Sequence, residues 1–206
     1  MEGAIPNIVQ PISRARIAIL SVGGVYLVSI LFGIIMAHSG NPFALHYRDK
    51  LVSDAVQHEP AAIALHQGNP LGAALLDFTG NLLLGSVPES IMGMGIVFPY
   101  PWVAYQGWVG GIVSVRGDHT SRFNDIRSAV YYLLTLLLQI TAYCLTVGAG
   151  VNVGVSLFWP APYYQGEKWA RLFPKEALRD WIKIYAIAAP IFLLGSVWEF
   201  FSRWNI

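Results

Sequence analysis

The sequence has little charge and almost no cysteine. Only 12% of its 206 residues are Asp, Glu, Lys or Arg, whereas an average soluble domain has roughly 25%, and 55% are hydrophobic. The net charge is +1 and there is no block of Lys or Arg, so composition gives no basis for a nucleic-acid surface. The one cysteine, Cys144, lies in an apolar run, which excludes a disulfide or a Cys-pair metal site within this chain. Composition therefore predicts an integral membrane protein that binds no nucleic acid.

Catalytic and cofactor motifs are also missing. The chain has no Walker loop, no dinucleotide-binding glycine pattern, no GxSxG elbow and no c-type haem motif. Four of its five histidines fall in one polar stretch, but their separations of eight, twelve and eight residues match no common ligand spacing; they are His38, His46, His58 and His66. We expect a protein that is not an enzyme, with no cofactor and no metal site.

Long apolar windows make up most of the chain. They cover residues 17–37, 71–87, 91–115, 129–158 and 181–201. A window of about 20 residues is long enough to cross the hydrocarbon core of a bilayer. The sequence therefore predicts an all-α, multi-pass helical bundle of four or five spans, forming a single domain over residues 1–206. Window 17–37 follows Arg14 and Arg16, and we interpret it as a retained first span with a cytoplasmic N-terminus.

The second and third windows leave the position of one break open. Residues 71–115 carry two candidate breaks, 86–90 around Pro88 and 98–101 with two prolines. A turn at Pro88 places residues 98–101 in mid-bilayer, where irregular backbone is tolerated only if protein or a watery cavity covers it. A turn at 98–101 places their aromatic neighbours at a membrane face. We favour broken or re-entrant half-helices in this region.

Two polar segments have an amphipathic pattern. Residues 38–70 are too polar to span and form the longest predicted extramembrane segment, with Phe43, Tyr47 and Leu51 at helical spacing. Residues 168–183 alternate apolar and basic side chains. Both segments are predicted to contain helices that lie along the membrane surface.

Six polar residues inside the apolar windows or in the short gap between the second and third are candidate functional residues, because such groups are costly in a membrane unless they face a partner or water. They are Asp77, Asn81, Glu89, Gln106, Gln139 and Glu199. Asp77 and Asn81 are four residues apart and share a helix face, where they can join helices or line a solute path. Glu199 is close enough to a span end to reach the interface beside Arg203.

Glycines at close spacing predict tight helix packing. Gly107 and Gly111 form one GxxxG pair, and Gly150 and Gly154 form another with Gly148 beside it. Small residues at this spacing let helix backbones approach closely in lipid. We expect these five glycines at helix–helix contacts, within the bundle or with a partner.

Three stretches together resemble the integral membrane family of the stage II sporulation protein M type. They are residues 78–85 running into the glycine-rich 93–111, residues 136–154, and residues 178–199 with a mid-helix proline and a closing glutamate. Gln139 stands where the family pattern has a glutamate. The resemblance covers residues 71–201 and implies a multi-pass scaffold in the bacterial cytoplasmic membrane.

These observations predict two alternative functions. The first is a non-catalytic subunit that scaffolds a larger membrane complex, with other integral membrane subunits and the lipid bilayer as its partners. The alternative is a membrane component of a small-molecule or ion transporter, in which Asp77, Asn81 and Glu89 contact the solute.

Overall fold

The protein is a bundle of long apolar helices. The computed structural model describes residues 9–169 and 172–202. Within these residues, four helical segments are long and apolar enough to cross a membrane: Val9–His38, Pro70–Gly93, Ile126–Phe158 and Lys175–Phe201. The all-α, multi-pass class predicted from the sequence is therefore confirmed.

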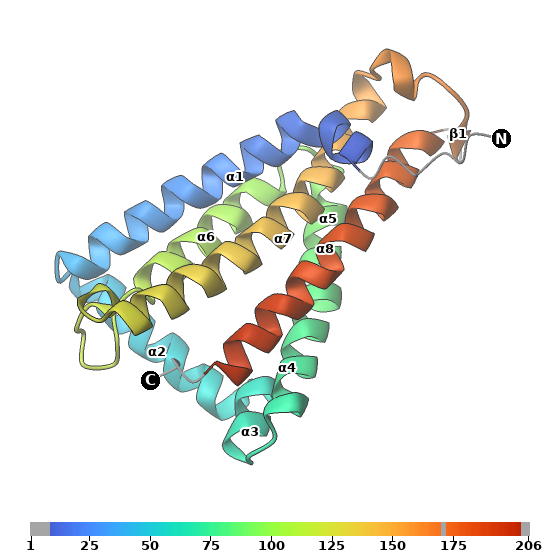
Figure 1. Cartoon of the computed structure of the whole chain (residues 1–206). Coiled ribbons are helices and arrows are strands. Elements are labelled where there is room, and N and C mark those ends of the chain that lie inside the picture. Colours follow the sequence, from blue (N-terminus) through green and yellow to red (C-terminus); the bar gives the residue numbers. More distant parts are fainter. Residues whose placement is uncertain (1–8, 170–171, 203–206) are drawn as a thin grey trace.

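Helix α7 (Ile126–Phe158) lies at the centre of the bundle. It packs against α1 (Val9–His38), α5 (Val87–Gly93) and α8 (Lys175–Phe201), while α6 (Pro99–Ile112) runs along α1 (Figure 1). Small side chains dominate this core, where Ala142, Val147 and Ala149 are buried and Phe192 of α8 fills the space beside them. Close helix contact in lipid depends on such small residues.

The second span is one continuous helical segment that passes through Pro88. It consists of α4 (Pro70–Thr79), the π-helix η1 (Gly80–Ser86) and α5. In η1 the hydrogen-bond register widens, so that the Val87 N–H donates to the Leu82 carbonyl, five residues earlier. Pro88 follows directly, where the changed register accommodates a residue that has no N–H. Residues 86–90, one of the two candidate breaks, are therefore helical.

The chain turns at residues 94–98, immediately before Pro99. Ile96 has a φ of 64°, an uncommon backbone conformation for a β-branched residue. Helix α6 then starts with Pro99 in its first turn, where a missing N–H costs nothing. Its 14 residues extend about 21 Å, which is less than the roughly 30 Å of a hydrocarbon core. Helix α6 is thus the short helix of this region.

Residues 38–70 form two helices beside the ends of the spans. They are α2 (Pro42–His58) and α3 (Pro60–His66), and each has proline in its first turn. The Asn41 side chain caps α2 by accepting hydrogen bonds from two backbone N–H groups. On α2, Ala44 and Arg48 are buried, and Tyr47 packs on Trp108 of α6. The amphipathic pattern of this segment therefore corresponds to a helix docked on α1 and α6.

The helix expected over residues 168–183 is wrong in its first half. Residues Lys168–Trp169 (β1) and Phe173–Pro174 (β2) form a small antiparallel hairpin, and α8 begins only at Lys175. Pro174 explains the difference, because proline disfavours helical geometry in the residue before it. Short 3₁₀ turns complete the connections, η2 (Arg122–Asn124) before α7 and η3 (Pro162–Tyr164) after it.

Candidate functional site

The α6 glycines lie against α1. A Cβ atom added to Gly107 would be 2.9 Å from the Tyr26 carbonyl oxygen, and one added to Gly111 would be 2.8 Å from the Cα of Gly33. Both distances are shorter than real Cβ contacts, so α6 and α1 approach as closely as they do only because these positions are glycine.

The α7 glycines lie against α1 and the α5 end of the second span. An added Cβ would be 2.6 Å from the Ile19 Cα at Gly148, 2.7 Å from the Ser90 Oγ at Gly150 and 2.7 Å from the Met94 carbonyl carbon at Gly154. Each of the five glycines singled out in the sequence thus packs against this chain itself. No partner is needed to account for their spacing.

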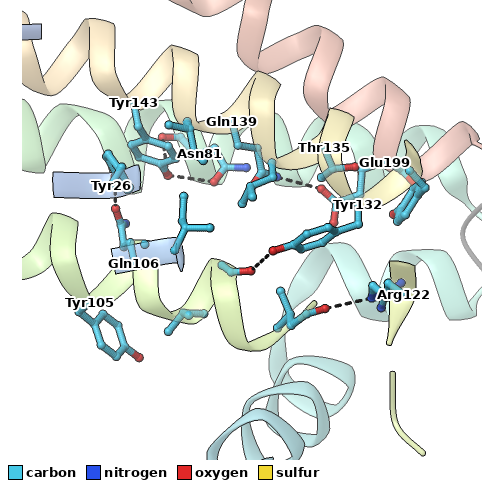
Figure 2. A pocket seen from close by; sticks show the side chains of 18 of the residues that line it. Tyr26, Asn81, Tyr105, Gln106, Arg122, Tyr132, Thr135, Gln139, Tyr143 and Glu199 are labelled. Carbon is cyan, nitrogen blue, oxygen red and sulfur yellow. Dashed lines mark hydrogen bonds between the residues drawn. The ribbon is translucent and has the colours of Figure 1, made fainter. Parts of the chain in front are cut away.

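A cavity of about 500 Å³ lies among α1, α6, α7 and the end of α8. At one end it is lined by Val52 of α2 and by Val113 and Arg122 of the connection before α7. At the other end it reaches Asn81 and Tyr143, deep among the spans (Figure 2). Its lining on α7 runs from Tyr131 to Tyr143, about 18 Å at 1.5 Å per residue. The cavity therefore extends from the α2 side into the middle of the bundle.

Polar side chains of four helices line this cavity and bond to one another. The Tyr143 hydroxyl donates to Asn81 Oδ1 at 2.9 Å, and Gln139 Nε2 donates to Glu199 Oε2 at 2.9 Å. The Tyr132 hydroxyl donates to the Gly110 carbonyl at 2.9 Å (Figure 2). Such bonds fix the helices, and they also place phenol, amide and carboxyl groups along one wall.

The transport alternative places Asp77, Asn81 and Glu89 on one solute path, but only Asn81 lines the cavity. Asp77 Oδ2 accepts a hydrogen bond from the Ser196 hydroxyl at 2.6 Å, between α4 and α8. Asn81 lines the cavity, whereas Asp77 and Glu89 do not. Glu199 does not reach outward to the interface but turns inward to Gln139, and Arg203 lies outside the described residues.

Glu89 lies beneath the inner end of the cavity. Its side chain is buried, and Oε1 accepts hydrogen bonds from Gln106 Nε2 at 2.7 Å and Trp102 Nε1 at 2.9 Å. Gln106 lines the cavity and accepts a hydrogen bond from the Tyr26 hydroxyl. Within the described part of the chain, Glu89 Oε2 has no hydrogen-bond partner. Tyr26 and Gln106 thus separate a buried carboxyl group from the cavity.

The outer end of the cavity carries the guanidinium group of Arg122. Arg122 donates from Nε to the Val113 carbonyl at 3.0 Å and forms no ion pair with any acid that the structure describes. Burial lowers the pKa of Arg122, and the nearby charges of Arg48 and Arg116 lower it further. Because burial disfavours the charged form of Arg122, an anion that binds beside the guanidinium stabilises it.

A group of acids lies near Glu199. The charges of Asp77 and Glu59 both act on the Glu199 carboxyl. Glu59 lies at the junction of α2 and α3, and burial together with the charge of Asp77 raises its pKa. Tyr131 lies between the two charged regions, since both Glu199 and Arg122 act on its hydroxyl. The lining of the cavity therefore includes one guanidinium group, of Arg122, and one carboxyl group, of Glu199.

A four-residue repeat of polar side chains in the α7 sequence indicates this cavity, although none of the repeated residues is charged. Polar residues recur every four positions in the apolar window of α7, at Tyr131, Thr135, Gln139 and Tyr143. Residues at this spacing form one stripe along a helix, and all four line the cavity. Arg122 was missed because it lies in a connecting segment, where a single arginine is unremarkable in sequence.

The connection at residues 113–125 is fastened to α2. His119 Nε2 lies 2.9 Å from Asp49 Oδ2, and Arg48 Nη1 donates to Asp49 Oδ1 at 3.0 Å. Hydrogen bonds from His119 and from Arg48 hold the pKa of Asp49 below its ordinary value. The wall that carries Arg122 is therefore tied to the helix beneath it.

Histidines and acids form no metal site in residues 9–169 and 172–202, where no three His, Cys, Asp or Glu side chains converge. His38 stacks on Phe123, and His58 and His66 each contact the carbonyl four residues earlier in their own helices.

The fold and the site define a helical membrane protein with a cavity among its spans, in which polar side chains interrupt a mostly apolar lining. Comparison with protein-family models, curated proteins and solved structures finds no match. The resemblance to the stage II sporulation protein M family therefore stays a prediction, and function has to be argued from the cavity.

Proposed function

We propose that this protein binds a small polar solute in the cavity among α1, α6, α7 and α8, as a membrane component of a transport system. The observation that supports this function is the cavity itself: about 500 Å³, lined by phenol, amide, carboxyl and guanidinium groups within an otherwise apolar bundle. Sites for small organic ligands have volumes of roughly 300–1,000 Å³ with a few convergent polar groups.

Energetics also favour a bound solute over a purely structural role for these groups. Glu199 lines the cavity, and its Oε1 has no hydrogen-bond partner among the described residues. Unpaired polar groups in a bilayer-spanning region are costly, each by roughly 1–3 kcal/mol. A polar solute, or the water it displaces, satisfies such groups. The transport alternative therefore takes precedence over the scaffold that the glycine pairs suggested.

A matched pair of neighbouring leucines provides the test. Leu136 lines the cavity, whereas Leu137 is exposed on the outer face of α7. Purified wild type, Leu136→Trp and Leu137→Trp are each dialysed to equilibrium against a polar small-molecule extract of bacterial cells. Retained solutes are then identified by mass spectrometry. We expect at least one solute to be enriched by wild type and by Leu137→Trp and lost in Leu136→Trp.

Transport is tested with the solute so identified. Proteoliposomes of wild type and of Leu137→Trp are expected to take it up faster than protein-free liposomes, and Leu136→Trp to match the protein-free rate. Equal retention by all three proteins, or retention of no solute by any of them, would refute the proposed function.

A second candidate, a subunit that docks in a larger membrane complex, is favoured by the α1–α6 face. A groove of about 360 Å³ there is lined by Ser29, Phe32, Met36, Phe43, Ala104 and Trp108. Small residues flanked by aromatic ones suit the close approach of a partner helix. The expected setting is the bacterial cytoplasmic membrane, with other integral membrane subunits as partners.

This second candidate is tested by copurification from native membranes in mild detergent. Ala104→Trp fills the groove, whereas Leu194→Trp places the same indole side chain at an exposed position on α8. Partner subunits that copurify with wild type and Leu194→Trp and disappear with Ala104→Trp support docking at this face. A lone protomer in every sample contradicts it.

A further inference from the structure

A guanidinium and a carboxyl group line different regions of the cavity, and this arrangement restricts what it binds. Arg122 lines the outer region; Arg48 and Arg116 are nearby, but each pairs with an aspartate, Asp49 and Asp125 respectively. Glu199 lines the region towards α8, where the charges of Asp77 and Glu59 act on it. A ligand with both an acidic group and an ammonium group can place a suitable partner on each of these side chains.

Arg122 has hydrogen-bonding capacity left for a ligand. Its Nε is used by the Val113 carbonyl, which fixes the guanidinium plane. The terminal nitrogens have no partner among the described residues, and the side chain is half-buried in the cavity wall. A planar guanidinium with free terminal N–H groups binds phosphate or carboxylate in two-point contact.

Glu199 also has a free acceptor. Its Oε2 accepts from Gln139 at 2.9 Å, and its Oε1 has no hydrogen bond to any residue that the structure describes. Gln139 lines the same cavity, and with its Nε2 used by Glu199 its side-chain oxygen is an acceptor with no hydrogen bond to any residue that the structure describes. An ammonium group, which has donors only, is matched to two such acceptors.

We propose that the cavity binds a zwitterion, with the acidic group of the ligand on Arg122 and its ammonium group between Glu199 and Gln139. This inference rests on the proposed function and names the class of its solute. Tyr131, Thr135 and Leu136 also line the cavity, so the linker that joins the two groups of the ligand would lie against these side chains. Phosphate and ammonium groups joined in this way occur both in free solutes and in a zwitterionic lipid headgroup.

The experiment uses three probes that differ only in their charged groups. They are 2-aminoethyl phosphate, ethyl phosphate without the amine, and ethanolamine without the phosphate. Binding to the full chain in phosphatidylcholine nanodiscs is measured by titration calorimetry. We expect 2-aminoethyl phosphate to bind at least tenfold more tightly than either single-group probe.

Two variants assign the ends of the ligand, and a third serves as control. Arg122→Gln is expected to weaken 2-aminoethyl phosphate and ethyl phosphate at least tenfold and to leave ethanolamine unchanged. Glu199→Gln is expected to weaken 2-aminoethyl phosphate and ethanolamine and to leave ethyl phosphate unchanged. Arg127→Gln removes an exposed arginine that does not line the cavity and is expected to bind all three probes as wild type does.

The source of the headgroup is resolved by repeating the titration in nanodiscs of phosphatidylethanolamine. Weaker binding of the soluble probe there identifies the lipid headgroup as a competitor, and unchanged binding identifies a free solute.

The zwitterion inference is overturned if the three probes bind equally, if none binds, or if Arg127→Gln weakens binding as much as Arg122→Gln. If the zwitterion inference fails in this way, a solute whose retention in the dialysis experiment depends on Leu136 still supports the proposed function. If no such solute is retained, both the zwitterion inference and the proposed function are refuted.

Discussion

Replacing Gly150 by alanine tests whether glycine determines the packing of α7 on α5. A Cβ at this position would contact the Ser90 carbonyl and lie 2.7 Å from the Ser90 Oγ. The α5 backbone therefore has to move. That movement disturbs two hydrogen bonds of Ser90, its Oγ donating to the Thr146 carbonyl at 2.6 Å and accepting from Trp181 Nε1 at 2.7 Å.

The size of the effect follows from these contacts. Overpacking a tight core costs about 1–3 kcal/mol, and hydrogen bonds between membrane helices average about 0.6 kcal/mol each. Gly150→Ala is therefore expected to lower the free energy of unfolding by about 2–4 kcal/mol. The assay is unfolding in mixed micelles of increasing SDS fraction, followed by tryptophan fluorescence.

Gly24→Ala is the matched control on α1. No atom lies within 4 Å of a Cβ built at Gly24, so the same chemical change there creates no collision. Alanine has a higher helix propensity than glycine, and this variant is expected to be as stable as wild type or more stable by up to about 1 kcal/mol. If the two variants unfold at the same SDS fraction, the assignment of Gly150 to a close helix contact is refuted.

Three further predictions concern polar contacts. Asp180 is buried and accepts hydrogen bonds from Arg14 Nη1 at 3.1 Å and from the Tyr164 hydroxyl at 3.0 Å. Asp180→Ala is therefore expected to lower the unfolding free energy by about 3 kcal/mol in the same SDS assay. The control Asp54→Ala, at an exposed position of α2, is expected to leave it unchanged. Ser196→Ala removes the donor to Asp77 and is expected to cost about 1 kcal/mol; a variant as stable as wild type would show that this contact is unimportant. Because the folded-state pKa of Asp49 lies below its ordinary value of 3.8, the contribution of Asp49 to stability is complete above pH 3.8 and is lost as the pH falls through the lower folded-state pKa. Proteolysis of residues 113–125 by pepsin is therefore expected to accelerate below pH 3.8 in wild type, and an equally steep change in Asp49→Asn would contradict the fastening of this segment to α2.

Sequence reasoning predicts the spans well because their signal is local. A run of about 20 apolar residues implies a membrane helix whatever it packs against, and the four long spans coincide with predicted windows. The position of the break between the second and third windows, by contrast, cannot be predicted from local sequence. Pro88 normally ends a helix, but here a π-helical register at residues 80–86 carries the chain through it. That register depends on packing against α7 and α8, which no local pattern contains.

The cavity shows a similar division between local and non-local information. Gln106, Gln139, Asn81 and Glu199 were found as costly polar residues in apolar windows, and all four line the cavity. Their role as one site depends on how α6, α7 and α8 meet, and so it needs the fold. Glu199 illustrates the limit, because a position close to a span end predicts solvent, whereas the tilt of α8 turns this side chain to Gln139. Likewise, GxxxG pairs predict a close contact without saying whether the partner helix belongs to the same chain.

The most direct test of the central claim measures whether water reaches the cavity. On a Cys144→Ala background, Leu136→Cys places a thiol on the cavity wall and Leu137→Cys places one on the outer face of α7. A charged, membrane-impermeant methanethiosulfonate reacts only with a thiolate, which forms in water and not in lipid. In nanodiscs, we predict labelling at position 136 at least tenfold faster than at position 137. Equal, slow labelling at both positions would contradict a polar cavity open to one side of the membrane.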